Sequence, residues 1–584
     1  MFAGPIFHRE VLTLPRQLGH YLARSGYVGL LFVLIYTAAQ TTFGFQDVRG
    51  IAAMADFGGL VFQILAFVQL TLVLFFSLLF AAGNVSQEKD RETLVLLLMT
   101  DLRNHEIVLG KLFAGLLPVA TLIVSSIPVF AFLQLLGGVD FSQIVWLFGL
   151  SAVSALLAGS WGAFVAFWKE KTFQTLAIGV LGIVAYLGVL EAVALLSPAS
   201  SGLANVANML SPFRAMARIM SPLSDASKLG AVTVSAFDAL GAMAALAVTL
   251  NAVAINRLRV WNPSRAFHVG RPAEKSTVTT NDESPHAQTK SRHRVIWSNP
   301  VLWREIMTRA YGRKIAFIKL IYVLIAGAAA YQLITADARG EAMLGIVSPA
   351  AFAFGGLGIL ALMLINAQAV TSITTERDGK TLDLIVATEI TAKEFVFGKL
   401  GGIFFNTKEL FLVPLILTGW FVASGSVSAE NGIYLAFGFL TLVAFAAMLG
   451  LHSGLGFASS KSAIANSLGT MFFLCVGIFV LMVLLVEARG SFGTQIQAFL
   501  VFIVAGSLAL VHSLTSRNPS PALRLAGGAL PFLTFYAITT FLLRGSLGVC
   551  VAIFLAYGFT TLAMLIPAVS EFDVALGRST VDKG

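Results

Sequence analysis

The sequence is poor in charged residues and contains almost no cysteine. Charged residues make up 12% of the 584 residues and hydrophobic residues 57%, whereas a soluble domain is usually about a quarter charged. This balance excludes an ordinary soluble protein and indicates a chain with many membrane-spanning segments. The two cysteines, Cys475 and Cys550, both stand in apolar runs, so the sequence predicts neither a disulfide framework nor a thiolate metal site.

A phosphate-binding loop is also missing. No G-x-x-x-x-G-K-[ST] motif occurs: Gly379-Lys380-Thr381 has Thr374 where the first glycine should stand, and Gly398-Lys399 is followed by Leu400. Without that cradle the chain is not expected to hydrolyse ATP by the P-loop route. No two His, Asp or Glu residues lie four apart within an expected span, so no metal site is predicted. No catalytic residues are predicted either.

Long apolar runs recur along the chain, and a membrane-spanning helix needs about 20 mainly apolar residues. We expect spans near 27–45, 58–82, 112–136, 143–168, 173–197, 229–254, 315–335, 346–370, 405–424, 432–458, 463–487, 493–514, 527–543 and 547–568. Several of these runs are short or interrupted by Gly and Pro, so the expected total is 12 to 14. The predicted fold class is therefore an all-α polytopic membrane protein.

The positive charges are distributed unevenly along these segments. With a cytoplasmic N-terminus, 32 of the 39 Lys and Arg residues fall in inside segments and seven fall outside. Because cytoplasmic loops carry an excess of Lys and Arg, this bias predicts the orientation. The net charge of +9 then reflects membrane topology, and no nucleic acid partner is expected.

One polar segment occurs twice. Val85–Leu112 and Ile373–Leu400 align without a gap at an offset of 288, with 11 of 28 positions identical. The identical pairs are Glu88/Glu376, Asp90/Asp378, Thr93/Thr381, Leu94/Leu382, Leu96/Leu384, Thr100/Thr388, Glu106/Glu394, Val108/Val396, Gly110/Gly398, Lys111/Lys399 and Leu112/Leu400. Positive-inside topology alone would not require the acids to recur. We therefore expect a docking device at the cytoplasmic face, although a topology-setting loop stays open for any one copy.

The repeated segment suggests local structure. Glu88 and Arg91 are three residues apart at the end of a helix, where they can pair. Thr93–Met99 is mostly Leu and Val and too short to span, which favours a short helix packed on the membrane or on a cytosolic partner. Gly110 permits close packing, and Lys111 can keep its ammonium group at the level of the lipid headgroups.

The repeat extends to the start of each half. Gly4–Glu10 matches Asn299–Glu305, with Pro5/Pro300, Arg9/Arg304 and Glu10/Glu305 in register. Each of these segments suits an amphipathic helix in the cytoplasmic interface. We expect a first half over 1–260, a polar, flexible linker over 261–298, and a second half over 299–584 with about two extra C-terminal spans. The recurrence in the same order indicates parallel halves, compatible with a pseudo-two-fold axis along the membrane normal.

The pattern E-[KR]-D-x-x-T-L, followed by E-[IF]-x-x-G-K after the second span, resembles the membrane subunits of ATP-binding-cassette exporters of the ABC-2 type. The resemblance implies that the segment is a coupling loop seated in an ATPase subunit. It assigns coupling roles to Glu88, Lys89, Asp90, Thr93, Leu94, Glu376, Arg377, Asp378, Thr381 and Leu382. It assigns the return into the membrane to Glu106, Gly110, Lys111, Glu394, Gly398 and Lys399. The chain departs from the family at Glu92 and Lys380, where glycine is common.

The resemblance also implies partners. Two separate ATPase subunits would bind ATP and magnesium, membrane lipids would surround this chain, and the complex would lie in a bacterial inner (plasma) membrane. This chain would form the substrate path without a cofactor of its own.

An alternative is a secondary transporter with a parallel internal repeat. Such a protein should bury ion-coupling carboxylates near the midplane, and only Asp238, roughly ten residues into its span, is a candidate. A hydrogen-bonded carboxylate between helices fits Asp238 equally well. A membrane enzyme should show clustered Asp, His or Arg outside the repeat, and no such cluster stands out.

Overall fold

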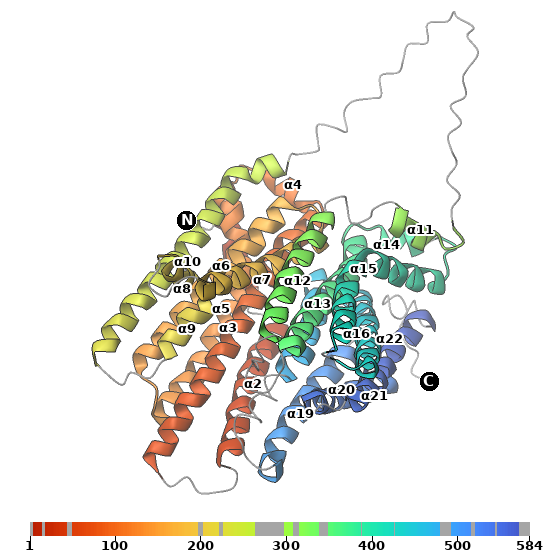
Figure 1. Ribbon diagram of the computed structural model, residues 1–584. Helices are drawn as coiled ribbons and strands as arrows, with labels where there is room; N and C mark the ends of the chain where they lie inside the picture. The colour runs from red at the N-terminus through yellow and green to blue at the C-terminus, as the bar shows by residue number, and fades with distance from the viewer. Residues whose placement is uncertain are drawn as a thin grey trace, which may run out of the picture.

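The computed structural model describes residues 4–13, 18–43, 50–196, 202–220, 226–262, 297–307, 315–337, 349–386, 388–425, 427–478, 492–515, 520–542 and 546–570. All regular elements within these residues are helical. Eleven of these helices are long and apolar enough to cross a membrane, and Ile318–Tyr331 and Leu500–Thr515 are shorter apolar helices. The predicted all-α polytopic membrane protein is confirmed (Figure 1). Most of the expected linker lies outside the described residues.

The first half contains six long helices and four short ones among its described residues. They are α1 (Gly4–Thr13), α2 (Leu18–Phe43), α3 (Ile51–Asp90), α4 (Thr93–Leu98), α5 (Asn104–Leu136), α6 (Phe141–Trp168), α7 (Thr172–Leu196), α8 (Gly202–Leu210), α9 (Pro212–Met220) and α10 (Ala226–Trp261).

The described part of the second half begins the same way and then contains additional helices. Its elements are α11 (Pro300–Met307), α12 (Ile315–Asp337), α13 (Pro349–Asp378), α14 (Leu382–Val386), α15 (Ala392–Ala423), α16 (Ala429–Gly456), α17 (Ser460–Phe472), η3 (Phe473–Gly477), α19 (Phe492–Thr515), α20 (Pro521–Leu542), α21 (Ser546–Ile553), η4 (Phe554–Gly558) and α22 (Phe559–Ser570). The elements η3 and η4 are π-helical turns that continue α17 and α21.

The internal repeat extends well beyond the segment in which the sequence shows it. Helices α3 and α13 end at Asp90 and Asp378, and α5 and α15 begin at Asn104 and Ala392. Helices α6 and α16 correspond residue for residue, and α17 begins 288 residues after α7. The two halves therefore share one framework, held in a single register from α3 and α13 to the start of α7 and α17.

A glycine at the same place in each half allows two helices to cross closely. A Cβ atom added to Gly162 of α6 would lie 2.7 Å from the carbonyl oxygen of Leu78 in α3. At the equivalent Gly450 of α16 it would lie 2.7 Å from the carbonyl oxygen of Asn366 in α13. These separations are too short for any side chain, so glycine sets the distance between the helices in both halves.

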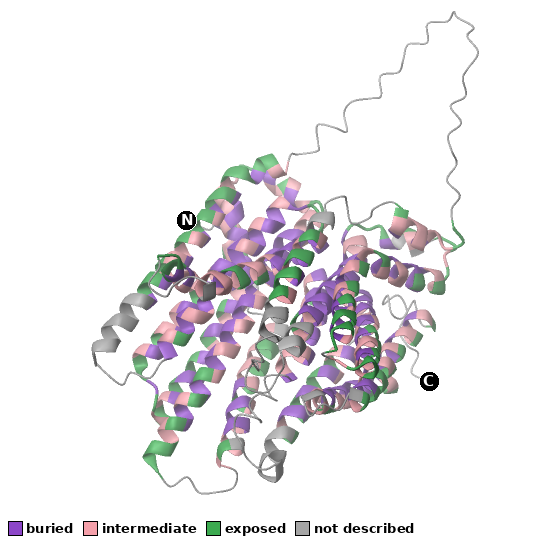
Figure 2. Ribbon diagram, viewed as in Figure 1, coloured by how far each residue is buried: buried purple, intermediate pink, exposed green. Residues whose placement is uncertain are grey.

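Helices α3 and α13 form the centre of their halves. Residues 360–374 of α13 are buried without interruption, so this helix is enclosed on all sides (Figure 2). Helix α3 has 40 residues and is about 60 Å long at 1.5 Å per residue, twice the roughly 30 Å thickness of a bilayer's hydrocarbon core. Part of α3 therefore extends beyond the hydrocarbon core, and its last residues, 87–90, are polar.

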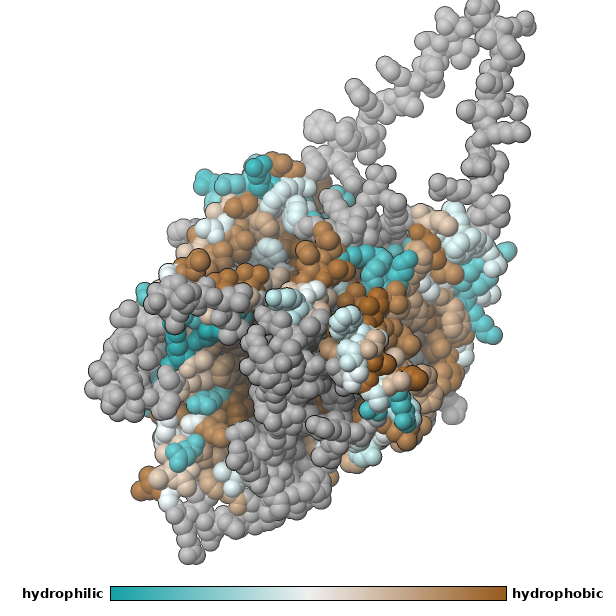
Figure 3. Space-filling model, viewed as in Figure 1, coloured by the Kyte–Doolittle hydropathy of each residue, from teal (hydrophilic) through white to brown (hydrophobic). Residues whose placement is uncertain are grey.

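The two copies of the repeated segment lie at the same end of the helical bundle, which we call the loop end. Helices α4, α11 and α14 all lie there in Figure 1. Hydrophobic residues cover much of the coloured surface of the body in Figure 3, and hydrophilic patches lie at this end as well as lower on the body. Equivalent helices therefore run in the same direction, as expected for parallel halves.

Among the helices that the structure describes, two of the second half have no counterpart in the first. The last helix of the first half, α10, packs on α6 and α5. In the second half the continuous run α21–η4–α22 packs on α16 and its α22 part on α15, so it takes the place of α10. The additional helices are thus α19 and α20, which precede the last span.

The halves meet along two seams, which we name by their helices. In the α7–α13 seam, α7 of the first half packs on α12 and α13. In the α3–α17 seam, α3 packs on α17, and α19 packs on α2. Figure 1 shows α12 next to α7 and α19 next to α2. The additional helix α19 therefore lies at the α3–α17 seam and not at the α7–α13 seam, so the two seams differ.

Candidate functional site

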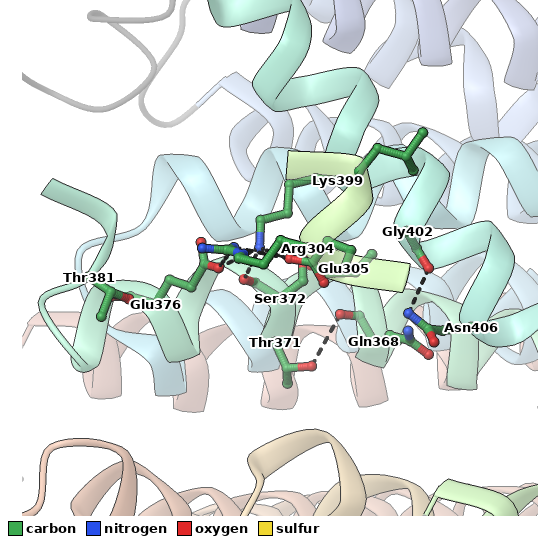
Figure 4. A network of polar contacts seen from close by, with 12 residues as sticks. Arg304, Glu305, Gln368, Thr371, Ser372, Glu376, Thr381, Lys399, Gly402 and Asn406 are labelled. Atoms are coloured by element: carbon green, nitrogen blue, oxygen red, sulfur yellow. Dashed lines mark hydrogen bonds and ion pairs between the residues drawn. The ribbon is translucent and has the colours of Figure 1, made fainter. Parts of the chain in front are cut away.

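The repeated segments contain a buried ionic network in the second half (Figure 4). The Lys399 ammonium group of α15 donates to the Glu305 carboxylate at 2.6 Å and the Glu376 carboxylate at 2.7 Å. It also donates to the Ser372 carbonyl oxygen at 3.2 Å. Arg304 of α11 contacts both carboxylates. Lys399 thus joins the opening helix, the central helix and the third span of this half.

The charges of this network depend on one another because they lie away from water. The Lys399 side chain is 1% exposed and that of Glu305 is 2% exposed. Burial by itself would raise the pKa of Glu305, but Lys399 and Arg304 hold that pKa below its ordinary value. Glu305 is therefore a carboxylate at neutral pH, and removing either cation would leave a buried charge unpaired.

The first half repeats the central ion pair of this network. Lys111 pairs with Glu88 at the positions equivalent to Lys399 and Glu376. The Glu88 side chain is 23% exposed, so water reaches this copy more easily. The expected pairing of Glu88 with Arg91 is wrong: Arg91 pairs with Asp378, because the register of α3 and α5 brings Lys111 to Glu88.

A cation in each copy ties the loop to the end of the fourth span. Lys89 donates to the carbonyl oxygens of Phe167 and Lys169 at 2.6 and 2.9 Å. The equivalent Arg377 donates to the carbonyl oxygen of Leu455 at 2.9 Å and to that of Phe457. The last carbonyl groups of a helix have no partner within the helix, so these cations cap α6 and α16 in the same way.

The neighbouring aspartates connect the loops to the start of the fifth spans. Asp90 accepts a hydrogen bond from Thr172, and the equivalent Asp378 accepts one from Ser460. Asp378 also accepts from Arg91 of the other half at 3.1 Å. Sequence reasoning missed the contacts of Thr172 and Ser460, although two hydroxyl residues at the repeat offset are visible in the sequence.

The opening helices dock on the third span of each half. A Cβ atom on Gly398 of α15 would lie 2.8 Å from the Cβ of Val301, and one on Gly402 would lie 2.5 Å from the Cβ of Glu305. In the first half α1 packs on α5, where Gly110 is buried. The predicted glycine thus admits α11 in the second half.

The short helices of the two copies share a turn and an exposed apolar face. Leu94 and Leu382 are buried, and the hydroxyl groups of Thr93 and Thr381 donate to the carbonyl oxygens of Glu88 and Glu376. By contrast, Leu96 is 64% and Leu384 is 70% exposed. These leucines protrude from the loop end, where a partner could cover them.

Each copy also builds a left-handed turn where the sequence has no glycine. Glu92 has a φ angle of 59° and the equivalent Lys380 has 54°, and they are the only non-glycine residues with positive φ in the described part of the chain. Left-handed backbone is unfavourable for most residues. Glu92 and Lys380 therefore both adopt the left-handed conformation that a glycine would adopt more easily.

The return into the membrane begins with matched helix caps. Glu106 accepts a hydrogen bond from the backbone N–H of Arg103, and Glu394 accepts one from that of Thr391. In the second half the Thr391 hydroxyl group also accepts a hydrogen bond from the Glu394 N–H at 3.2 Å, which completes a capping box. Glu106 and Glu394 therefore fix where α5 and α15 begin.

The remaining predicted residues lie on α1 and α10, and Glu10 of α1 interacts electrostatically with Lys461 near Lys111 and Glu88. Arg9 is exposed on α1, and Glu10 beside it is half-buried. Asp238 is exposed on α10, well before the loop end of that helix. Within the described residues, no three His, Cys, Asp or Glu side chains group so as to hold a metal ion.

These observations define a multi-pass helical membrane protein with a duplicated polar framework at one end. The chain matches no family model and no curated protein sequence.

Proposed function

We propose that this chain is the membrane-spanning permease of an ATP-binding-cassette exporter, driven by separate ATPase subunits that dock on the two repeated loops. The observation that carries the proposal is the pair of exposed leucines at one end of the molecule. Leu96 and Leu384 occupy equivalent positions on short helices held rigidly from inside. Exposed leucines on an ordered helix outside the bilayer are suited to a groove in a partner protein. Two equivalent helices favour two equivalent partners.

The contacts around each loop suit the transmission of force. The cations at positions 89 and 377 hold the fourth span, the aspartates at 90 and 378 hold the fifth, and the lysines at 111 and 399 hold the second and third. A push on the short helix would therefore act on several spans of its half together. Nucleotide-driven closure of two ATPases would tilt both halves and open a path between them.

The bacterial inner membrane, a cytoplasmic N-terminus and export as the direction of transport belong to the same proposal. The rival secondary transporter needs a buried carboxylate within the bilayer. Asp238 is exposed on α10 and gives that alternative no support.

The test is co-purification from native membranes with and without the exposed leucines. Glu88 and Glu376 are unsuitable targets, because they hold the loops from inside. Leu96→Glu/Leu384→Glu should abolish binding of a P-loop ATPase that accompanies the wild type, while the permease stays folded. Leu135→Glu, at a still more exposed leucine near the opposite end of α5, is the matched control. A wild-type chain that purifies without an ATPase under several mild detergents would overturn the proposal.

A further inference from the structure

The two seams between the halves differ in the contacts that hold them together, and the first difference is in the charged side chains. Arg91 reaches from the end of α3 to Asp378, which also binds Ser460 at the start of α17. Lys461 of α17 donates to the Asn84 side chain of α3. Both cations therefore bridge the halves next to the α3–α17 seam.

Neither bridge can form at the equivalent place on the other side. The register that relates the halves puts Gly379 at the position of Arg91 and Phe173 at that of Lys461. A glycine and a phenylalanine offer no charge to a neighbouring carboxylate or amide. These two charged bridges therefore have no counterpart at the α7–α13 seam. There Asp90 accepts a neutral hydrogen bond from Thr375 of α13 at 3.4 Å, and Phe173 and Leu176 lie in one apolar cluster with Ile318 and Tyr322.

The additional helix α19 is bonded to neighbouring helices of the second half. Its Ser513 donates to the Asn466 side chain of α17 at 2.8 Å. His452 of α16 bonds the carbonyl oxygen of Leu514 at 3.1 Å. The Phe473 ring lies against Gly506, where an added Cβ would come within 2.5 Å of it. Helix α19 is thus fixed to the second half.

The opposite face of α19 is fixed to the first half. Phe502 and Ile503 are buried in one apolar cluster with Leu31 and Leu34 of α2. At the equivalent place in the other seam, α12 contacts α7 directly without an intervening helix. Helix α19 therefore joins α2 to α17, and among the described elements no helix lies in this way between α12 and α7.

We infer that the halves separate along the α7–α13 seam while the α3–α17 seam stays closed and serves as a hinge. The inference rests on the proposed function, in which the halves move relative to each other. Any path would then open toward the lipid on one side of the molecule only.

The test compares two equivalent buried positions, Leu176 of α7 and Ile464 of α17. Single variants Leu176→Cys and Ile464→Cys are made in a Cys475→Ser/Cys550→Ser background and labelled with N-ethylmaleimide in native membranes. Labelling of a buried thiol requires local opening of the structure. The thiol of Leu176→Cys should therefore react with N-ethylmaleimide at least about tenfold faster than that of Ile464→Cys. Equal rates, or faster labelling of Ile464→Cys, would overturn the inference.

A second measurement guards against misfolding of either cysteine variant. Removing the bridges with Arg91→Gln/Lys461→Met should accelerate labelling of Ile464→Cys and leave that of Leu176→Cys unchanged, and the reverse pattern would refute the hinge.

The readout needs no ATPase. If none co-purifies but Leu176→Cys still reacts faster, the proposed function fails and the asymmetry stands. If an ATPase binds and the two positions react alike, the asymmetry fails and the proposed function stands.

Discussion

Replacing Lys399 with methionine should destabilise this protein far more than the same change at the equivalent Lys111. Lys399→Met keeps most of the side-chain volume but leaves Glu305 and Glu376 facing each other's charge with only Arg304 to balance them. Removing one partner from a buried ion pair costs about 3–5 kcal/mol. The Glu305 side chain is 2% exposed, so water cannot replace the lysine.

The same change at Lys111 leaves Glu88, whose side chain is 23% exposed. Water can then solvate that carboxylate in part, and leaving a polar group without its partner costs about 1–3 kcal/mol. Lys111→Met is therefore the matched control, since it makes the same chemical change at the same place in the framework.

Thermal unfolding of the purified protein in detergent, followed by tryptophan fluorescence, measures the difference. The melting temperature of Lys399→Met should lie clearly below that of Lys111→Met. Adding Glu305→Gln to Lys399→Met should recover part of the loss, because it removes the stranded charge. Equal melting temperatures for the two lysine variants, or no recovery in the double variant, would refute the role assigned to the buried network.

Three further outcomes follow from the geometry. Gly162→Ala and Gly450→Ala should each lower the free energy of unfolding by about 1–3 kcal/mol, since the new Cβ overlaps a backbone carbonyl group; Gly188→Ala, with nothing within 4 Å, should not, and equal melting temperatures for all three would contradict the close crossing. Glu92→Val should destabilise by about 1–2 kcal/mol while Glu92→Gly is tolerated, because left-handed backbone is worst for β-branched residues; similar thermal stabilities would argue against the turn. Stability should fall as acid protonates Glu305: its contribution is complete above its ordinary pKa of 4.5 and is lost as the pH drops through the lower pKa of the folded state. Melting temperatures measured between about pH 3 and 6 should therefore fall less steeply with acid in Glu305→Gln than in the wild type.

Hydropathy predicted most of the fold. The expected span at 143–168 is α6 at Phe141–Trp168, and the one at 493–514 is α19 at Phe492–Thr515. The ends were less accurate where polar residues continue a helix: α15 begins at Ala392 rather than near 405. Apolar length detects the part of a helix inside the bilayer, whereas the Thr391–Glu394 cap decides where the helix begins.

The candidate site was predicted only in part. Identity between the copies selected Glu376 and Lys399, and the matched opening segments selected Glu305, but nothing in the sequence said that these three residues meet. The pairing of Arg91 with Asp378 was not predictable from spacing, because it joins residues far apart along the chain. Equally, the position of α19 against α2 depends on packing between halves, for which an apolar helix carries no local pattern.

The capping of α6 and α16 explains why duplication is easy to see in one place and hidden in another. Lys89 and Arg377 bind main-chain oxygens, and every amino acid supplies such an oxygen. The donor has to remain a cation, lysine in one copy and arginine in the other, whereas the residues that supply the oxygens differ freely between the copies. Similarity between the two halves therefore remains visible at the donor side chains, whereas at the acceptors only the position of the backbone oxygen is shared.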